Sequence, residues 1–315
     1  MLTTLLAEHK SVREMARALG RSPSTVSREL QRNASPEYRL YLSQRAESRA
    51  AARRKRASRR PRLKHSRILS YVRAKLARGW SPEQIAGRIG LEQPGWAISH
   101  EAIYQYIYHP QTEGRQELIR CLRRAHGRRK PRNLGRRERR TKIPHRIAID
   151  CRPASVNNRR QFGHWEGDSL VSRKSAVALN TLVERNTRLL LLTRLERKTA
   201  QATSQAVVSR LEGWPRDARR TLTLDNGTEN ARHEGITASL GLRCYFAHPY
   251  ASWERGTCEH TNGLVRWYLP KGTDFRTITE EQSAQIEARI NNRPGKCLGF
   301  RTPIEAATPC VALQG

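Results

Sequence analysis

Two arginine-rich runs divide this chain and limit where its folded parts can lie. Residues 52–64 (ARRKRASRRPRLK) contain eight basic residues and no acidic one, and residues 127–142 (GRRKPRNLGRRERRTK) contain nine basic residues and one acidic one. Both runs contain proline and neither has an apolar stripe, so we interpret them as linkers or extended arms. They predict five segments: a small helical module (1–50), a basic linker (51–64), a second helical module (65–126), a basic linker (127–145) and a large domain (146–315).

The charge of the whole chain favours a polyanionic partner. Lys and Arg number 60 against 28 acidic residues, which gives a formal net charge of +32. A charge of this size opposes compaction unless a polyanion neutralises it, and phosphate contacts by the basic runs are the favoured interpretation. No apolar run approaches a membrane-spanning length, and the start of the chain lacks a signal-peptide pattern. We therefore expect a cytoplasmic, nucleoid-associated protein that binds nucleic acid and not a membrane.

The six cysteines, at positions 121, 151, 244, 258, 297 and 310, do not suggest a metal or disulfide framework. None forms a C-x-x-C pair, and no histidine pair has the spacing that would complete a zinc site. We expect reduced thiols and no structural zinc.

Residues 11–32 (SVREMARALGRSPSTVSRELQR) have the pattern of a helix-turn-helix. Ser11 and Glu14 form a capping box, Gly20 permits a tight turn, and Ser22 with Pro23 opens a second helix. With Val26 buried, that helix presents an outward, DNA-reading face for the major groove. The residues expected on or beside that face are Arg21, Ser24, Thr25, Ser27, Arg28 and Gln31. The alternative is a helical hairpin without a role in DNA binding.

Residues 80–108 resemble a looser copy of this motif. Ser81 and Gln84 form another capping box, and Ser99 opens a second helix, but the connection GLEQPGWA is long for a helix-turn-helix. DNA binding is favoured over a helical spacer that only packs.

The C-terminal domain has a mixed α/β pattern. Apolar and β-branched runs at 163–172, 177–184, 188–195, 220–225 and 242–247 predict strands. Helices are expected at 199–211, 229–240, from about 255, and at 279–290. Three consecutive strands imply an antiparallel meander, and the later alternation implies parallel crossovers, so we expect a mixed sheet with helices on both faces.

Three acidic residues stand out from their surroundings. Asp168 lies in the otherwise apolar run GHWEGDSLV, Asp225 closes RTLTLD before an Asn-Gly turn, and Glu259 lies near the start of a helix. The predicted topology can bring the three together, where they would repel one another unless a cation neutralised them. Oxygen ligands without His or Cys select Mg²⁺ or Mn²⁺, and two such ions promote phosphoryl displacement. The alternative is that each carboxylate is structural or solvated.

Several segments together resemble the IS-thirty family of bacterial insertion-sequence transposases. The matching motifs are GHWEGD (163–168), LVERNTR (182–188), TLDNGTE (223–229), PYASWERGTCEHTNGLVRWYLPKGTDF (249–275) and NNRPGKCLGFRTP (291–303), together with the helix-turn-helix stretch. The resemblance covers nearly the whole chain and implies a ribonuclease-H-like, DDE-type catalytic domain preceded by all-α DNA-binding modules.

The resemblance also implies a site and an activity. The catalytic and metal-binding residues fall on Asp168, Asp225 and Glu259, with two Mg²⁺ ions, or Mn²⁺ as a substitute. The implied reaction is cleavage and strand transfer of double-stranded DNA at terminal inverted repeats, into target DNA, by a homodimer or higher oligomer. Arg255, Arg266 and Lys271 are expected to contact phosphates, and Trp253 and Tyr250 either stack on a splayed base or pack in the core. The alternative is a transcriptional regulator with an inactive integrase-like domain.

The chain departs from the family pattern beside the third carboxylate. Cys258 and His260 flank Glu259 where the family usually has asparagine, and His248 replaces an aspartate. We interpret these changes as structural rather than catalytic. The chain also starts ten residues before the first capping box, so an abbreviated first helix is expected.

Overall fold

The computed structural model describes residues 1–34, 41–58, 63, 65–122, 143–249 and 251–312. Its contacts divide the chain into two compact units, 1–64 and 65–315. Within the described residues, no helix is both long enough and apolar enough to cross a membrane.

The first unit contains the expected helix-turn-helix. Its helices are α1 (Leu2–Ala7), α2 (Val12–Ala18), α3 (Pro23–Asn33) and α4 (Ser43–Ser58). The Ser11–Glu14 capping box is present, and Gly20 has the positive φ, 61°, that the turn requires. Met15, Ala16 and Val26 form the core, and helix α1 covers it with its three leucines. The first helix therefore contributes directly to this small core.

The first basic run is partly helical, so its interpretation as a linker or extended arm was wrong for residues 51–58, which belong to α4. Arginine and alanine have high helix propensity, and the charge repulsion is offset where arginines meet carbonyls. Arg49 donates to the backbone oxygens of Asn33 and Ala34 at the end of α3, and Arg53 donates to the Asn33 side chain. The second basic run, 127–142, lies outside the described residues, and of the predicted linker 127–145 only 143–145 are described.

The second unit begins with four helices: α5 (Ser66–Ala77), α6 (Pro82–Glu92), α7 (His100–Tyr108) and α8 (Arg115–Arg120). The predicted caps of α6 and α7 at Ser81 and Ser99 are present. Helix α6 contacts the late segment 294–305: the Arg88 guanidinium pairs with Glu305, and Gln84 donates to the Pro294 carbonyl at 2.6 Å. This helix of the second module is thus held by the end of the chain.

The rest of the second unit is a five-stranded mixed sheet in the order β3-β2-β1-β4-β5. The strands are β1 (His164–Val171), β2 (Ala178–Glu184), β3 (Leu190–Leu195), β4 (Thr221–Leu224) and β5 (Arg243–Phe246). Strands β1 to β3 form the expected antiparallel meander, and β4 and β5 run parallel to β1. This strand order and polarity is the ribonuclease-H-like arrangement, as predicted.

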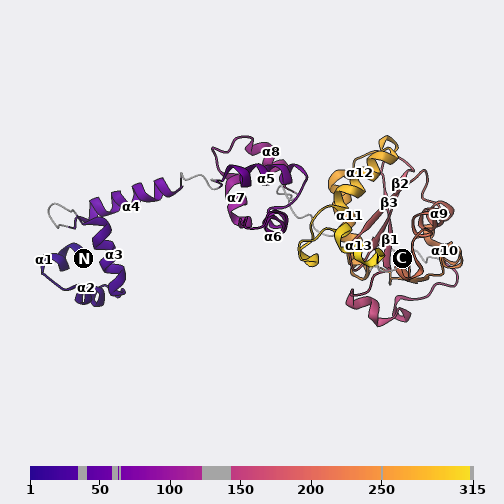
Figure 1. The fold of residues 1–315 in the computed structure, drawn as a ribbon, viewed down its shortest axis with the longest axis horizontal. Coiled ribbons are helices and arrows are strands. Elements are labelled where there is room, and N and C mark those ends of the chain that lie inside the picture. The colour runs from indigo at the N-terminus through magenta and orange to yellow at the C-terminus, as the bar shows by residue number, and fades with distance from the viewer. Residues whose placement is uncertain (35–40, 59–62, 64, 123–142, 250, 313–315) are drawn as a thin grey trace. The chain divides into compact units, whose positions relative to one another are not determined.

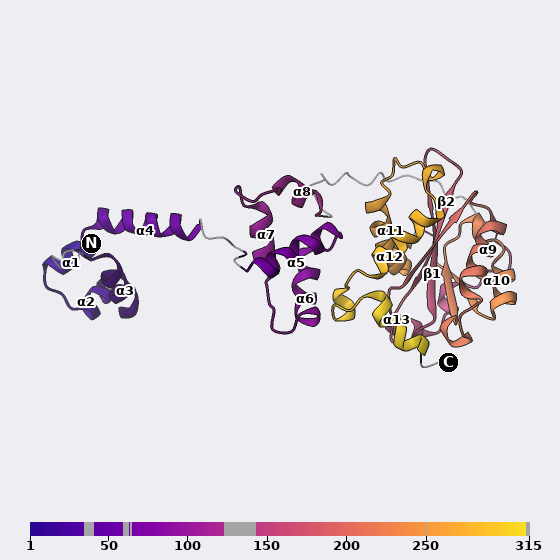
Figure 2. The ribbon, with the colours of Figure 1, turned by 45° about the horizontal axis from the view of Figure 1, so that its top comes forward.

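Helices cover both faces of the sheet (Figures 1 and 2). Helices α9 (Ala200–Leu211) and α10 (His233–Leu240) pack on one face, around the fully buried Trp165. Helices α11 (Gly256–Tyr268) and α12 (Glu280–Asn291) pack on the other, against Leu179, Val183 and Leu190. Side chains alternate between the two faces along a strand. Because Glu166 of β1 faces α11, the side chain of Asp168, two residues later, faces α11 as well.

Three further contacts complete the domain. Backbone N–H groups of β3 donate to α12 side chains, Leu190 to Asn291 at 2.8 Å and Leu192 to Glu287 at 2.6 Å. At the end of β5, the Phe246 N–H donates to the Ile147 carbonyl at 2.8 Å. The last helix, α13 (Pro303–Ala312), adds Ala307 to the core around Trp165.

Candidate active site

The sheet brings Asp168 and Asp225 to neighbouring positions. Asp168 lies in β1, and Asp225 directly follows β4. The parallel pairing of these strands matches Glu166 with Thr223, and continuing that register by two residues places Asp168 beside Asp225. Asp168 lies two residues after Glu166, and Asp225 lies two residues after Thr223. Side chains two residues apart share a face of the sheet, so both carboxylates lie on the face covered by α11.

Arg255 connects the two aspartates. Its guanidinium nitrogens lie 3.6 Å from Asp168 Oδ1 and 3.5 Å from Asp225 Oδ2, and Nη1 also donates to the Gly167 carbonyl at 3.1 Å. Only 14% of the Arg255 side chain is exposed. The sequence predicted a phosphate contact for this residue; here its charge faces the two carboxylates.

Two asparagines hold the aspartates in place. Asn262 of α11 donates to Asp168 Oδ2 at 2.8 Å, and Asn230 donates to Asp225 Oδ1 at 2.7 Å. Burial raises the pKa of Asp168; the Arg255 guanidinium opposes this effect and the Asp225 carboxylate adds to it. The site therefore holds two carboxylates in a partly desolvated position, where a cation between them is favourable.

Glu259 lies next to this pair without joining it. Arg255, Glu259 and Asn262 are four and three residues apart, so they share one face of the helical segment, and the first and last of them contact the aspartates. Glu259 itself is exposed. In the described part of the chain, no group of three or more His, Cys, Asp or Glu side chains is placed to hold a metal ion.

The pair of aspartates nevertheless fits a hard divalent cation. Their oxygen atoms are the ligands such ions prefer, and the Arg255 guanidinium already places positive charge between them. The exposed Glu259 lies about one helical turn from Arg255 and from Asn262, the two residues that contact the aspartates.

A buried ion pair, not singled out from the sequence, positions the start of α11. Glu166 is fully buried and pairs with Arg185, and its Oε2 accepts a hydrogen bond from the Cys258 N–H at 2.8 Å. Among the described residues, helix α11 has no side-chain cap of its own, so this carboxylate from β1 satisfies one of its free N–H groups. The only sequence signal was an acidic residue two positions before Asp168 in an apolar strand.

The residues that depart from the family pattern have identifiable places. Cys258 is completely buried, its Sγ lies 3.5 Å from the Thr181 hydroxyl, and burial raises the pKa of its thiol. His248 lies between Glu254 and Asp150, at 2.8 and 2.9 Å, and the Glu254 hydrogen bond is the main cause of its raised pKa. His260 is exposed beside Glu259. Cys258 is thus a core residue, and His248 links two segments.

The remaining predicted DNA contacts fall into two groups. In the first unit, Arg21, Ser24, Thr25 and Arg28 are exposed and Ser27 is half-buried, so the predicted face of α3 is accessible. In the second unit, Lys271 is exposed, whereas Arg266 lies over the Phe275 ring and donates to the Val171 carbonyl at 2.8 Å. Trp253 is 75% exposed and does not pack in the core, and Tyr250 lies outside the described residues.

Comparison with known proteins assigns the family. Residues 2–33 match a family model described as a helix-turn-helix domain. The transposase for insertion sequence element IS1086 of Cupriavidus metallidurans is 40% identical over 97% of this chain and 91% of its own length. The transposase InsI for insertion sequence element IS30A of Escherichia coli is also 40% identical, over 98% of this chain and 81% of its own length.

The chain belongs to the IS30 family of insertion-sequence transposases. A further relative, the transposase for insertion sequence element IS4351 of Bacteroides fragilis, is 38% identical over 96% of this chain and 92% of its own length. The predicted IS30-family membership is thereby confirmed. Among solved structures, the catalytic core domain of BIV integrase is similar at a TM-score of 0.38 and 19% identity, covering 48% of this chain and 96% of that one. The strand order and polarity, rather than this similarity, identify the fold.

Proposed function

We propose that this chain is the enzyme that moves an insertion sequence: it binds the terminal inverted repeats and catalyses DNA cleavage and strand transfer. The observation that carries the proposal is the placement of Asp168 and Asp225 side by side beneath α11, with Arg255 between them. Family membership supports the same reaction, and the accessible face of α3 supports sequence-specific DNA binding.

In this proposal Asp168, Asp225 and Glu259 hold the divalent ions, Mg²⁺ or Mn²⁺. Two such ions, when bound, would activate an attacking oxygen and stabilise the leaving one in phosphoryl displacement. Asn230 and Asn262 orient the two aspartates, and the exposed Glu259 completes the set from the helical face that also carries Asn262. Arg255 neutralises the aspartates before the ions and DNA arrive. We further propose that the active form is a homodimer or higher oligomer on DNA.

The test uses isosteric variants and a matched control. Asp168→Asn, Asp225→Asn and Glu259→Gln should each abolish cleavage and joining of labelled terminal-repeat DNA in Mg²⁺, because an amide is a poor replacement for an anionic ligand. Gel-shift binding to the same DNA should remain. Glu212→Gln changes an exposed acid at the end of α9 and should leave cleavage unchanged. Wild-type cleavage by Asp225→Asn would remove the proposed role of that residue.

A second candidate is a DNA-binding regulator with an inactive integrase-like domain. The observation that favours it is that Arg255, rather than Glu259, contacts the two aspartates. The two candidates differ in one measurement. A regulator would bind terminal-repeat DNA and give no nicked or joined product in either Mg²⁺ or Mn²⁺.

A further inference from the structure

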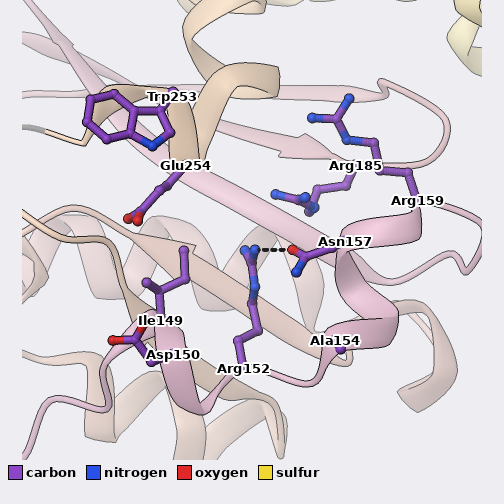
Figure 3. A pocket seen from close by; sticks show the side chains of 9 residues that line it. All are labelled: Ile149, Asp150, Arg152, Ala154, Asn157, Arg159, Arg185, Trp253 and Glu254. Atoms are coloured by element: carbon purple, nitrogen blue, oxygen red, sulfur yellow. Dashed lines mark hydrogen bonds between the residues drawn. The ribbon is translucent and has the colours of Figure 1, made fainter.

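A basic pocket with an exposed aromatic ring lies next to strands β1 and β4, which its arginines contact at Glu166 and Thr223. Figure 3 shows the side chains that line it. Its volume is about 520 Å³. One wall comes from η1 (Ile149–Cys151) and η2 (Ala154–Asn158), and another from η5 (Ser252–Arg255). The lining residues are Ile149, Asp150, Arg152, Ala154, Asn157, Arg159, Arg185, Trp253 and Glu254.

The aromatic part of the pocket is Trp253. Its side chain is 75% exposed, and in Figure 3 the indole lies above Glu254, across the pocket from Arg159 and Arg185. Covering an exposed indole with another planar or apolar group is favourable, because it removes apolar surface from water. The ring is therefore available for stacking.

The cationic part consists of three arginines. Arg152 donates to two neutral groups, the Thr223 hydroxyl at 2.9 Å and the Asn157 side chain at 2.7 Å. Arg185 is 4% exposed, and its Nε has no hydrogen-bond partner in the described part of the chain, although its Nη1 pairs with Glu166. Arg159 is exposed and has a left-handed backbone, with φ at 54°.

The acidic residues of the lining do not neutralise these arginines directly. Asp150 and Glu254 both pair with His248. Among the described residues, no carboxylate lies within 4 Å of the Arg152 or Arg159 guanidinium. Glu166 and Glu254 act on Arg152 only from a longer distance. The pocket therefore combines a stacking surface with two arginines, Arg152 and Arg159, that have no direct carboxylate partner among the described residues, and such a combination can bind a base and its phosphate.

We propose that this pocket binds one unpaired nucleotide of the DNA substrate. The base stacks on Trp253, and Arg152 and Arg159 contact the adjoining phosphate. A base inside a duplex has both faces covered, so only a nucleotide outside the stack can use the indole. This inference rests on the proposed function, because it assumes that DNA lies across the aspartates.

The pocket is placed to receive a nucleotide close to the reacting one. Arg152 contacts Thr223 of β4, and Arg185 contacts Glu166 of β1. Thr223 and Glu166 are themselves paired across the two strands. Asp225 and Asp168 lie two residues further along the same strands. Two residues of a strand span about 7 Å, or roughly two nucleotide steps of a stacked DNA strand. A strand held at the aspartates would thus extend over the pocket.

The test compares two DNA probes with the full chain in EDTA. One probe is a terminal-repeat duplex with a single unpaired 2-aminopurine nucleotide at its end; the other has an abasic residue at that position. The wild type should bind the first probe more tightly, by at least about fivefold, and stacking should quench the 2-aminopurine fluorescence. Trp253→Ala should lose both effects, and Trp253→Phe should keep most of both.

A second pair of variants tests the phosphate contact. Arg159→Ala should weaken binding of both probes and reduce the salt dependence by about one counterion. Arg243→Ala is the matched control, because this exposed arginine lies at the start of β5, away from Asp225, and it should leave binding of both probes unchanged.

Each outcome decides the proposal. If Trp253→Ala still prefers the base over the abasic residue by the wild-type ratio, the pocket does not bind the nucleotide. Equal binding of both probes by the wild type would overturn the proposal in the same way. Because EDTA prevents metal-dependent cleavage, a chain that shows the preference but never cuts DNA in Mg²⁺ would refute the proposed enzyme and leave the pocket assignment standing.

Discussion

The Arg255 guanidinium lies 3.6 Å from the Asp168 carboxylate and reaches Asp225 with its other terminal nitrogen. A divalent ion that binds both aspartates must compete with this arginine. We therefore predict that Arg255→Gln binds Mg²⁺ more tightly than the wild type in the absence of DNA, because the competing charge is gone. Mg²⁺ titration of the thermal unfolding temperature measures this.

The control for that measurement is Asp225→Asn, which should lose most of the stabilisation by Mg²⁺. If Arg255→Gln binds Mg²⁺ as weakly as the wild type, or more weakly, the guanidinium does not compete for the ion position. DNA cleavage by Arg255→Gln should still fall, since the residue also donates to the Gly167 carbonyl and fixes the start of α11.

The exposed face of α3 gives a prediction about specificity. Arg28 is exposed on this helix, and its Nε donates to the Ser24 carbonyl at 3.0 Å. Arg28→Ala should weaken binding to terminal-repeat DNA more than to scrambled DNA, by about 1–3 kcal/mol if Arg28 contacts a base edge. Arg13→Ala, an exposed charge on α2, serves as the control. A uniform loss on both DNAs would instead assign Arg28 to a phosphate.

A pair of glycines in α6 tests its contact with the C-terminal segment. A Cβ at Gly87 would lie 2.4 Å from the Phe300 ring, whereas the nearest atom at Gly90 is the Trp96 carbonyl oxygen at 3.6 Å. Gly90→Ala should stabilise the helix by about 0.5–1 kcal/mol. Gly87→Ala should instead destabilise the protein by about 1–3 kcal/mol, because the ring must move. Urea unfolding midpoints compare the two.

The double variant Gly87→Ala/Phe300→Leu completes this comparison. If the ring is the cause, the smaller side chain should recover part of the loss, a coupling expected only for residues in contact. A stabilising Gly87→Ala substitution would show that α6 does not rest on Phe300.

A buried histidine makes stability depend on pH. His164 is 5% exposed and is within hydrogen-bond distance of the Thr221 hydroxyl, and burial, together with neighbouring arginines, lowers its pKa to about 4. The folded protein keeps this imidazole neutral, while the unfolded chain takes up a proton below about pH 6.5. The contribution of His164 to the free energy of unfolding is therefore complete above about pH 6.5. It falls by up to about 3 kcal/mol as the pH drops towards 4.

Other groups titrate in the same range, so the comparison with a variant isolates this one. His164→Gln cannot take up the proton, and the unfolding free energy of the wild type should fall more steeply between pH 7 and 5 than that of the variant. Parallel pH profiles would exclude His164 as the source.

The sequence predicted the sheet well because its strands differ sharply from their surroundings. Each of the five apolar runs became a strand within two residues of the expected bounds, and their order dictated the meander and the crossovers. Asp168 and Asp225 were identifiable for the same reason, since a carboxylate in or directly after an apolar strand is unusual.

The parts that sequence reasoning missed depend on partners distant in the chain. The sequence suggested a phosphate contact for Arg255, because nothing local shows that β1 and β4 place two carboxylates beside it. The Glu166–Arg185 pair is likewise formed by strands whose relative position only the fold reveals. In α4 the error was different: the density of positive charge obscured the helix propensity of arginine and alanine.

The bonds from Leu190 and Leu192 to α12, and from Phe246 to residue 147, occupy backbone groups on the outermost strands β3 and β5. Two copies of this domain consequently have few free amides with which to join their sheets into one continuous ribbon. If two copies act on the two ends of one element, their meeting surface must be built from side chains or bridged by the DNA itself.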